Sequence, residues 1–252
     1  MDRLTDRIAI ITGAASGIGA ATARLFAGEG AALVLADVQA GPGEAVAQAI
    51  RAEGGRAEFR RTDVTQAAEV EALVAAAVAR HGRLDVLVNN AGNVGEFAPT
   101  AECTEENWDF LSNLNLKSAF LGCKYGLAPM LRQGAGAIVN LSSTAGVVGF
   151  AGRPGYSAAK TGIVGLTRTV ALEYADRGIR VNCVCPGATL TPMLERLEEL
   201  YPGRHDYLRE RVPMRRLADP GEVARAILFL ASDDSSFVTG VALPVDGGRH
   251  IR

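Results

Sequence analysis

The sequence predicts a doubly wound α/β fold, in which helices cover both faces of a parallel sheet. Short apolar, β-rich runs alternate with longer helical runs, and no linker, repeat or low-complexity tract interrupts the 252 residues. The strand-like runs are mostly continuous in apolar residues rather than alternating, as expected for strands that are buried on both faces. Strict alternation of strand and helix favours a parallel sheet of about seven strands in a single domain spanning residues 1–252.

Length distinguishes the expected elements, because strands are short apolar runs and helices are longer ones. The expected strands are residues 8–12, 32–37, 57–61, 84–89, 137–142, 181–185 and 241–245. The expected helices begin at about Gly17 and Gly43 and cover residues 67–81, roughly 105–132, about 156–175 and 220–231. Residues from about 190 to 216 break this rhythm. Such sheets bind ligands outside the carboxyl ends of their strands, so functional residues are expected there.

The composition indicates an ordinary globular protein. Hydrophobic residues make up 48% of the chain, and a net charge of −2 without a basic stretch gives no reason to expect nucleic acid. The longest uninterrupted apolar run, residues 72–79, is far too short to span a bilayer. The polar residues 1–7 lack the apolar region of a signal peptide. We therefore expect a cytoplasmic protein without membrane contact.

Cysteine and histidine residues give no sign of a metal site. Cys183 and Cys185 share a predicted strand, Cys103 and Cys123 stand alone, and the three histidines are scattered. A Cys-x-Cys pair on one strand is not a zinc knuckle. Reduced core thiols are the simpler interpretation, and no metal is expected.

A glycine-rich turn follows the first predicted strand. It reads Thr12-Gly13-Ala14-Ala15-Ser16-Gly17-Ile18-Gly19. Glycines let the backbone turn sharply and approach a pyrophosphate, and the next helix offers free N–H groups and the positive end of its dipole. The spacing differs from the commoner Gly-x-Gly-x-x-Gly pattern, and a plain glycine turn is the alternative. The position between a strand and a helix favours a dinucleotide site.

Asp37 ends the second predicted strand, 18 residues after Gly19. A carboxylate there accepts hydrogen bonds from the hydroxyls of an adenosine ribose and repels the additional phosphate of NADP. Neither Val38 nor residues 14–16 supply a basic side chain to pair with that phosphate. We therefore expect NAD rather than NADP as the cofactor. A solvated carboxylate at a strand end is the alternative interpretation.

The next four predicted strands also end in polar or small residues. They are followed in turn by Asp63-Val64, Asn89-Asn90-Ala91-Gly92, Ser142-Ser143 and Pro186-Gly187-Ala188-Thr189-Leu190-Thr191. The first pair is expected to border an adenine, the asparagines to tie strand ends together, and the threonines to reach a carboxamide. Each segment also has an ordinary interpretation as a turn or a helix cap. Agreement at six consecutive strand ends favours a dinucleotide site.

Tyr156 and Lys160 are four residues apart in a predicted helix and therefore project from the same face. A nearby ammonium favours the phenolate and is expected to lower the pKa of Tyr156. A tyrosine with such a pKa exchanges a proton with an alcohol or a carbonyl near neutral pH. The Ser142-Ser143 pair lies one short segment upstream.

Together with Asn115, these residues resemble the short-chain dehydrogenase/reductase family over essentially the whole chain. The resemblance implies a Rossmann-type sheet, with Tyr156 as general acid/base and Lys160 lowering its pKa and binding the nicotinamide ribose. Ser143, favoured by the family spacing over Ser142, would hold the substrate oxygen. Asn115 would bind a water that links Lys160 to solvent. Without the resemblance, Asn115 would be interpreted as a polar helix residue whose side chain is hydrogen-bonded to the backbone of its own helix.

The resemblance also assigns the cofactor contacts. They are expected to be Gly13, Ser16, Gly17, Ile18, Gly19, Asp37, Asp63, Val64, Asn90, Ala91, Gly92, Tyr156, Lys160, Pro186, Gly187, Thr189 and Thr191. The implied reaction is hydride transfer between NAD and a secondary alcohol or ketone, without a metal. Residues from about 190 to 216 would form the substrate lid, whose apolar residues suit a medium-sized, partly apolar substrate.

Two further expectations concern the charged residues of the lid segment and the oligomeric state. The charges of the lid are expected on a solvated face, and no Arg or Lys position demands an anionic substrate. The family implies a homo-oligomer, a tetramer or else a dimer.

One open alternative is an NADPH-dependent reductase of the 3-oxoacyl-carrier-protein type. Asp37 is an argument against this alternative. The other is a dinucleotide-binding sensor without turnover, which the complete set of Asn115, Ser143, Tyr156 and Lys160 counts against.

Overall fold

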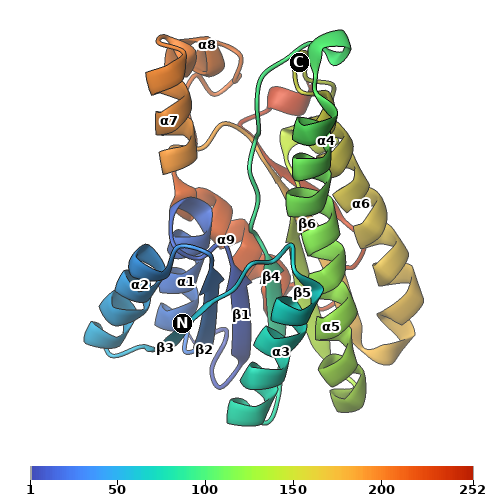
Figure 1. The fold of residues 1–252 in the computed structure, drawn as a ribbon. Helices are drawn as coiled ribbons and strands as arrows, with labels where there is room; N and C mark the ends of the chain where they lie inside the picture. The colour runs from blue at the N-terminus through green and yellow to red at the C-terminus, as the bar shows by residue number, and fades with distance from the viewer. Residues whose placement is uncertain (1, 252) are drawn as a thin grey trace.

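A computed structural model describes residues 2–251 as helices packed on both faces of one seven-stranded sheet (Figure 1). All strand pairs are parallel, and the strand order is β3-β2-β1-β4-β5-β6-β7. The strands are β1 (Ile8–Thr12), β2 (Ala32–Asp37), β3 (Arg56–Arg61), β4 (Val86–Asn89), β5 (Gly136–Leu141), β6 (Ile179–Pro186) and β7 (Ala242–Val245). The strand order reverses between β1 and β4, which makes the sheet doubly wound.

The helices divide into two layers and a group beyond the sheet. The α-helices are α1 (Gly17–Gly28), α2 (Ala40–Ala52), α3 (Ala67–His81), α4 (Glu105–Leu111), α5 (Ser118–Gln133), α6 (Pro154–Tyr174), α7 (Pro192–Leu200), α8 (Arg204–Glu210) and α9 (Pro220–Ala231). Helices α1, α2 and α9 pack on one face of the sheet, and α3, α5 and α6 pack on the other. Helices α4, α7 and α8 extend beyond one end of the sheet (Figure 1).

Side chains of the central strands alternate between the two layers. Ile11 of β1 packs with the α1, α2 and α9 side chains, whereas its neighbour Ile10 packs with those of α3, α5 and α6. Both side chains are fully buried. Burial on both faces explains why the central strands are continuously apolar in sequence. The edge strand β3 differs from them, because its three arginines are exposed.

Local sequence signals fix several helix ends. Pro220 occupies the first turn of α9, and Asp219 and Glu222 form a capping box before it. At the other end of a helix, Gly82 terminates α3 with a left-handed backbone at φ 77°, a conformation that glycine adopts without strain. These signals explain why the predicted bounds of α3 and α9 agree with the structure.

The fold prediction is confirmed, with differences at particular elements. The helix expected at about Gly43 begins at Ala40, and the helix expected over residues 105–132 is interrupted by a π-helix, Ser112–Lys117. The segment that breaks the β-α rhythm contains α7 and α8. No helix within residues 2–251 is long and apolar enough to cross a membrane.

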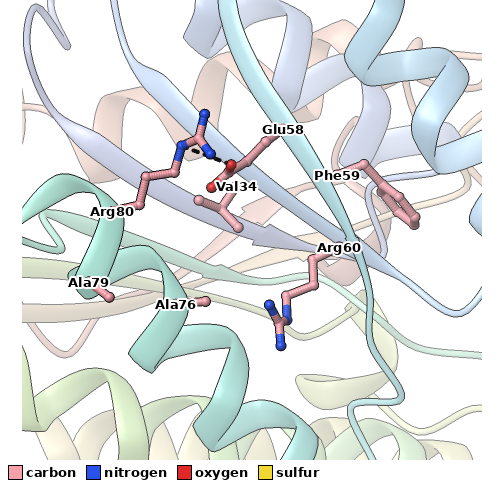
Figure 2. Close-up of a pocket in the computed structure, with 7 residues that line it drawn as sticks. All are labelled: Val34, Glu58, Phe59, Arg60, Ala76, Ala79 and Arg80. Atoms are coloured by element: carbon pink, nitrogen blue, oxygen red, sulfur yellow. Dashed lines mark ion pairs between the residues drawn. The ribbon is translucent and has the colours of Figure 1, made fainter.

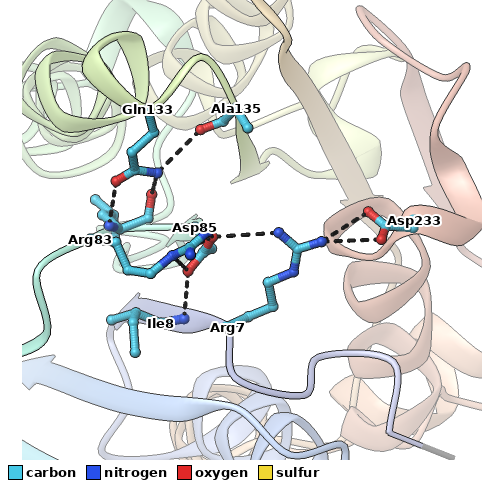
Figure 3. Close-up of polar contacts among 8 residues, drawn as sticks. Arg7, Ile8, Arg83, Asp85, Gln133, Ala135 and Asp233 are labelled. Carbon is cyan, nitrogen blue, oxygen red and sulfur yellow. Dashed lines mark hydrogen bonds and ion pairs between the residues drawn. The ribbon is translucent and has the colours of Figure 1, made fainter.

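A buried carboxylate connects the amino ends of β1 and β4, opposite the predicted site (Figure 3). Asp85, 4% exposed, accepts a hydrogen bond from the backbone N–H of Ile8 at 2.9 Å. Arg83 donates to both of its oxygens, at 2.6 to 3.1 Å, and Arg7 lies between Asp85 and the exposed Asp233. The Asp85 carboxylate thus interacts with one strand N–H group and with the guanidinium groups of Arg83 and Arg7.

Replacement of Asp85 by alanine should destabilise the fold without affecting the predicted site. Removal of one partner from a buried charge network costs about 3 kcal/mol, which corresponds to a fall of roughly 6–12 °C in Tm. Thermal unfolding followed by circular dichroism measures the change. Asp233→Ala is the control, because an exposed ion pair contributes at most about 1 kcal/mol. Equal Tm values for the two variants would contradict this account.

Candidate active site

The predicted site residues lie along the carboxyl edge of the sheet, where the strand order reverses. Asp37, Asp63 and Val64 lie at the β2 and β3 end of this edge, and Ser143 and Gly187 lie at the β5 and β6 end. The glycine turn after β1 and the Asn90 segment after β4 lie between them. The structure therefore places the two groups of residues at opposite ends of the carboxyl edge of the sheet.

The glycine turn after β1 is packed tightly against the segment that follows β4. Gly13 has a φ of 64°, and a Cβ atom there would lie 2.8 Å from both the Cα of Ala91 and the Nδ2 of Asn90. Asn90 itself donates from Nδ2 to the carbonyls of Thr12, at 2.9 Å, and Gly13, at 3.0 Å. The expectation that amides tie neighbouring strand ends together is thus met by Asn90.

Helix α1 begins at Gly17 with backbone donors that no helical carbonyl accepts. The first α-helical hydrogen bond runs from the N–H of Ala20 to the carbonyl of Ser16, at 3.1 Å, and the side chain of Ser16 does not cap the helix. A Cβ atom at Gly19 would collide with the carbonyl oxygen of Gly13. The turn therefore combines a close backbone approach with free N–H groups, which is the chemistry that holds a phosphate.

Asp37 closes the end of β2 beside the glycine turn. Its Oδ2 accepts a hydrogen bond from the N–H of Ala15 at 3.1 Å, and its Oδ1 accepts one from Gln39 at 3.0 Å. The neighbouring residue across the sheet is Arg61, whose Nη1 lies 3.8 Å from the Oε2 of Glu69. The one basic residue in register with Asp37 thus already faces a carboxylate.

Asp63 forms a local turn after β3. Its Oδ1 accepts hydrogen bonds from the backbone N–H of Thr65 at 2.9 Å and from its hydroxyl at 2.7 Å. Burial alone would raise the pKa of Asp63, but the bonds from Thr65 and Gln66 and the charge of Arg61 outweigh it, and the pKa lies below its ordinary value. Asp63 is therefore ionised at neutral pH, and the adjacent Val64 is buried.

Ser143 and Tyr156 line the same cleft at the other end of the edge. Ser142 is turned away, because its hydroxyl donates to the carbonyl of Lys160 at 2.7 Å. Ser143 accepts a hydrogen bond from the N–H of Ala145 at 3.1 Å. The structure thus distinguishes the two serines in the way that the family spacing implies.

The pKa of Tyr156 differs from the expectation. Burial raises it above its ordinary value, and the Ser143 hydroxyl and the positive charge of Arg153 offset this only in part. The Nζ of Lys160 lies 5.7 Å from the centre of the Tyr156 ring and donates to the carbonyl of Leu141, at 2.8 Å. Burial also lowers the pKa of Lys160 to about 8.

Asn115 and Lys160 converge on Gly92. A Cβ atom at Gly92 would lie 2.6 Å from the Oδ1 of Asn115 and 3.3 Å from the Nζ of Lys160. The Nδ2 of Asn115 donates to the carbonyls of Asn93, at 3.0 Å, and Leu111, at 3.1 Å. Asn115 lies in the π-helix between α4 and α5, where the regular i to i−4 ladder is broken. Its backbone partners therefore include a loop far away in sequence as well as its own helix.

Thr189 and Thr191 form hydrogen bonds with the backbone between β6 and α7. Thr191 caps α7 by accepting a hydrogen bond from the N–H of Leu194 at 3.4 Å, so the ordinary interpretation as a helix cap applies to it. Its methyl group lies 3.1 Å from the position of a Cβ atom at Gly17. Thr189 is buried, and its hydroxyl donates to the carbonyl of Gly187 at 3.1 Å. Thr191 thus lies against the start of α1.

The cleft beside Tyr156 has a volume of about 120 Å³ and reaches from β5 and β6 to α7 and α8. Its lining residues are Val94, Ser143, Thr144, Ala145, Phe150, Arg153, Tyr156, Pro186, Gly187, Ala188, Leu194, Leu197, Arg204, Leu208, Val212 and Arg249. Leu194 and Leu197 are apolar residues of the expected lid segment that line the cleft. The expectation that the charges of residues 190–216 lie on a solvated face is wrong for Arg204, which lines the cleft together with Arg153 and Arg249.

Sequence reasoning overlooked Arg153 and Arg249 and assigned Arg204 to a solvated face. One signal was available for Arg153, since it lies three residues before Tyr156 at the start of the same helix. The other two arginines reach the cleft from segments distant in sequence, and no local pattern marks them.

A second hollow lies between β3 and α3, away from these residues (Figure 2). Its walls are formed by Val34, Glu58, Phe59, Arg60, Ala76, Ala79 and Arg80. Glu58 and Arg80 form an ion pair across it at 3.0 Å. The hollow contains none of the predicted site residues. Within residues 2–251, no group of three or more His, Cys, Asp or Glu residues is arranged to hold a metal.

The chain is similar to known proteins over nearly its whole length. A family model described as "Enoyl-(Acyl carrier protein) reductase" matches residues 13–250. The cis-4-hydroxycyclohexanecarboxylate dehydrogenase of Sinomonas cyclohexanicum is 48% identical, over 98% of each chain. The 3-oxoacyl-[acyl-carrier-protein] reductase of Thermotoga maritima is 42% identical, over 99% of this chain and 100% of the other.

Solved structures agree with the sequence relatives. The crystal structure of a levodione reductase superposes with a TM-score of 0.94 at 40% identity, and covers 98% of this chain and 99% of the other. The seven-stranded sheet and the matched sequence extend together across the chain. This protein belongs to the short-chain dehydrogenase/reductase family.

Proposed function

We propose that this protein transfers a hydride between NAD and a secondary alcohol or ketone. One observation carries the proposal: Ser143 and Tyr156 line the same cleft, and Lys160 and Asn115 converge on Gly92. Relatives named as a hydroxycyclohexanecarboxylate dehydrogenase and a levodione reductase support the reaction type. The complete set of four residues favours turnover over a sensor without activity.

The residues at the strand ends fit a dinucleotide. The space at Gly13 and Gly19 admits no side chain, and the N–H groups at the start of α1 favour a pyrophosphate. Asp37 would bind the adenosine ribose, Asp63 and Val64 would border the adenine, and residues 90–92, 186–187, 189 and 191 would flank the nicotinamide half. When bound, the nicotinamide would supply the acceptor or donor of the hydride.

NAD is favoured over NADP by the charge beside the glycine turn. The carboxylate of Asp37 would repel a 2′-phosphate, and Arg61, the basic residue in register with it, lies near Glu69. The second candidate is an NADPH-dependent 3-oxoacyl reductase, because the Thermotoga relative has that name. The charge of Asp37 disfavours this candidate.

The catalytic roles follow from the side chains around the cleft. In oxidation, the Tyr156 oxygen would take the proton of the substrate hydroxyl, and in reduction it would return it. Ser143 would hold the same substrate oxygen by a hydrogen bond. Lys160 would stabilise the deprotonated phenol and bind the nicotinamide ribose, and Asn115 would hold a water that connects Lys160 to solvent. General acid–base assistance of this kind contributes roughly 10²–10⁴-fold.

We also propose a homo-oligomer, a tetramer or a dimer, and a cytoplasmic location. Helices α5 and α6 lie side by side, and α6 presents Gly165 and the 86%-exposed Leu172 to solvent, with Phe120 exposed on α5. Exposed apolar surface of this kind supports association between copies. The four free cysteines of the described chain and a nicotinamide-dependent activity support the cytoplasm.

Tyr156→Phe should nearly abolish turnover, because the phenylalanine ring cannot exchange a proton. We expect kcat to fall by about 10²–10⁴-fold. NAD binding, measured by calorimetry, should change little because the glycine turn is intact. The measurement is NADH formation at 340 nm with a panel of secondary alcohols. Turnover within a few-fold of the unmodified enzyme would refute the assignment.

Asp37→Asn should weaken the preference for NAD over NADP. The amide keeps an oxygen that accepts from Ala15 but loses the charge that repels a phosphate. We expect the ratio of kcat/KM values for the two cofactors to fall by about tenfold or more, since 1.4 kcal/mol of repulsion equals one factor of ten. A clear preference of the unmodified enzyme for NADP would overturn the cofactor proposal.

Gly165→Arg should disrupt the oligomer while leaving the protomer folded. A Cβ atom at Gly165 meets nothing within 4 Å inside the protomer, so only a neighbouring copy would clash with the longer side chain. Native mass spectrometry measures the assembly. Gly41→Arg is the matched control, because Gly41 is also helical and open. A monomeric unmodified protein, or an unchanged mass for Gly165→Arg, would contradict the proposed interface.

A further inference from the structure

The cleft beside Tyr156 carries an unbalanced positive charge. Its charged lining residues are Arg153, Arg204 and Arg249, and no Asp or Glu is among the residues that line it. The remainder of the wall is largely apolar, with Val94, Phe150 and several leucines. Positive charge surrounded by apolar walls attracts an anion more strongly than the same charge on an open surface.

Arg153 is the most withdrawn of the three. It is 7% exposed, and its Nη1 donates to the carbonyl of Val94 at 3.1 Å. No Asp or Glu of residues 2–251 forms an ion pair with it, although buried guanidiniums are generally paired. Burial and the nearby charge of Arg204 lower the pKa of Arg153. A buried cation thus lies next to a second cation without a carboxylate between them.

Aromatic rings hold the other two guanidiniums in place. Arg204 lies 5.9 Å from the centre of the Phe97 ring, at the same distance as Arg153, and 4.9 Å from that of Tyr207. Arg249 lies 5.4 Å from the centre of the Phe150 ring. Such contacts orient a guanidinium without neutralising it, so its N–H groups remain available to an anion.

Three arginines of the same region outside the cleft form ion pairs with carboxylates. Arg196 pairs with Glu199 at 2.9 Å, and Arg216 pairs with Glu222 at 2.6 Å. Arg209, on the same helix as Arg204, pairs with Asp206. Carboxylates are therefore available to arginines in this region, yet none is among the residues that line the cleft.

We infer that the cleft selects a substrate that carries a carboxylate on an apolar skeleton, separate from the carbon that reacts. Arg153 and Arg204 bind the carboxylate, and Arg249 adds positive charge at the wall. Ser143 and Tyr156 hold the reacting oxygen in the same cleft, so a single small molecule reaches both groups. The guanidinium fork matches the two oxygens of a carboxylate. This inference rests on the proposed function, since it names the substrate class for that reaction.

The test compares an acid with its neutral ester. With NADH, 4-oxocyclohexanecarboxylate should be reduced at least tenfold more efficiently, in kcat/KM, than its methyl ester. Arg204→Gln should lower this acid-to-ester preference by about 10–100-fold, because hydrogen bonds to a charged partner contribute about 1.5–3 kcal/mol. Arg204→Lys keeps the charge without the fork and should lie between the two.

Arg209→Gln is the matched control, because Arg209 is on α8 but does not line the cleft. Its acid-to-ester preference should equal that of the unmodified enzyme. The inference is overturned if the unmodified enzyme reduces the ester as efficiently as the acid. It is also overturned if Arg204→Gln and Arg209→Gln have the same preference.

A binding measurement separates this inference from the proposed reaction. Calorimetry should show that cyclohexanecarboxylate binds the NADH-loaded enzyme at least tenfold more tightly than cyclohexanecarboxamide, and that Arg204→Gln removes the difference. Equal binding of the two ligands overturns the inference even if the ester is reduced. Tight binding of the carboxylate without turnover of any ketone contradicts the proposed function alone.

Discussion

The segment that follows β4 joins the two halves of the site. On one side, Asn90 and Ala91 pack so closely against Gly13 that the glycine turn admits no side chain. On the other side, Gly92 lies where Asn115 and Lys160 meet. A larger residue at either glycine would displace one half of the site from the other. The position of the dinucleotide turn relative to the catalytic side chains therefore depends on backbone contact within a few residues.

Burial shifts the pKa values of the titratable side chains in the site. It raises the pKa of Tyr156 and lowers that of Lys160, so both groups tend toward their uncharged forms. Arg153 supplies a positive charge that favours the phenolate, at the start of the helix that carries both residues. A cation that the sequence pattern does not mark thus contributes to the electrostatics of the phenol. The same arginine faces the cleft, which links the proton-exchanging group to the charge of the substrate.

Much of the fold was predictable from the sequence because its signals are local. Continuous apolar runs marked the central strands, and longer helical runs between them marked the helices. The π-helix around Asn115 was not predictable, because a backbone register shift leaves no trace in apolar spacing. The relation of Ser143 to Tyr156 could be expected from the family resemblance alone. The arginines of the cleft could not, since Arg204 and Arg249 come from separate segments that meet only in the folded chain. The raised pKa of Tyr156 depends on burial, which sequence spacing does not reveal.

The central claim is that hydride transfer occurs beside Tyr156. Its most direct test uses cyclohexanol or 4-hydroxycyclohexanecarboxylate with deuterium on the carbinol carbon, incubated with NAD, followed by mass spectrometry of the reduced cofactor. The account predicts that deuterium appears on the nicotinamide ring with the unmodified enzyme and stays at background with Tyr156→Phe. Undiminished label transfer by that variant, or no transfer from any secondary alcohol tested, would contradict it.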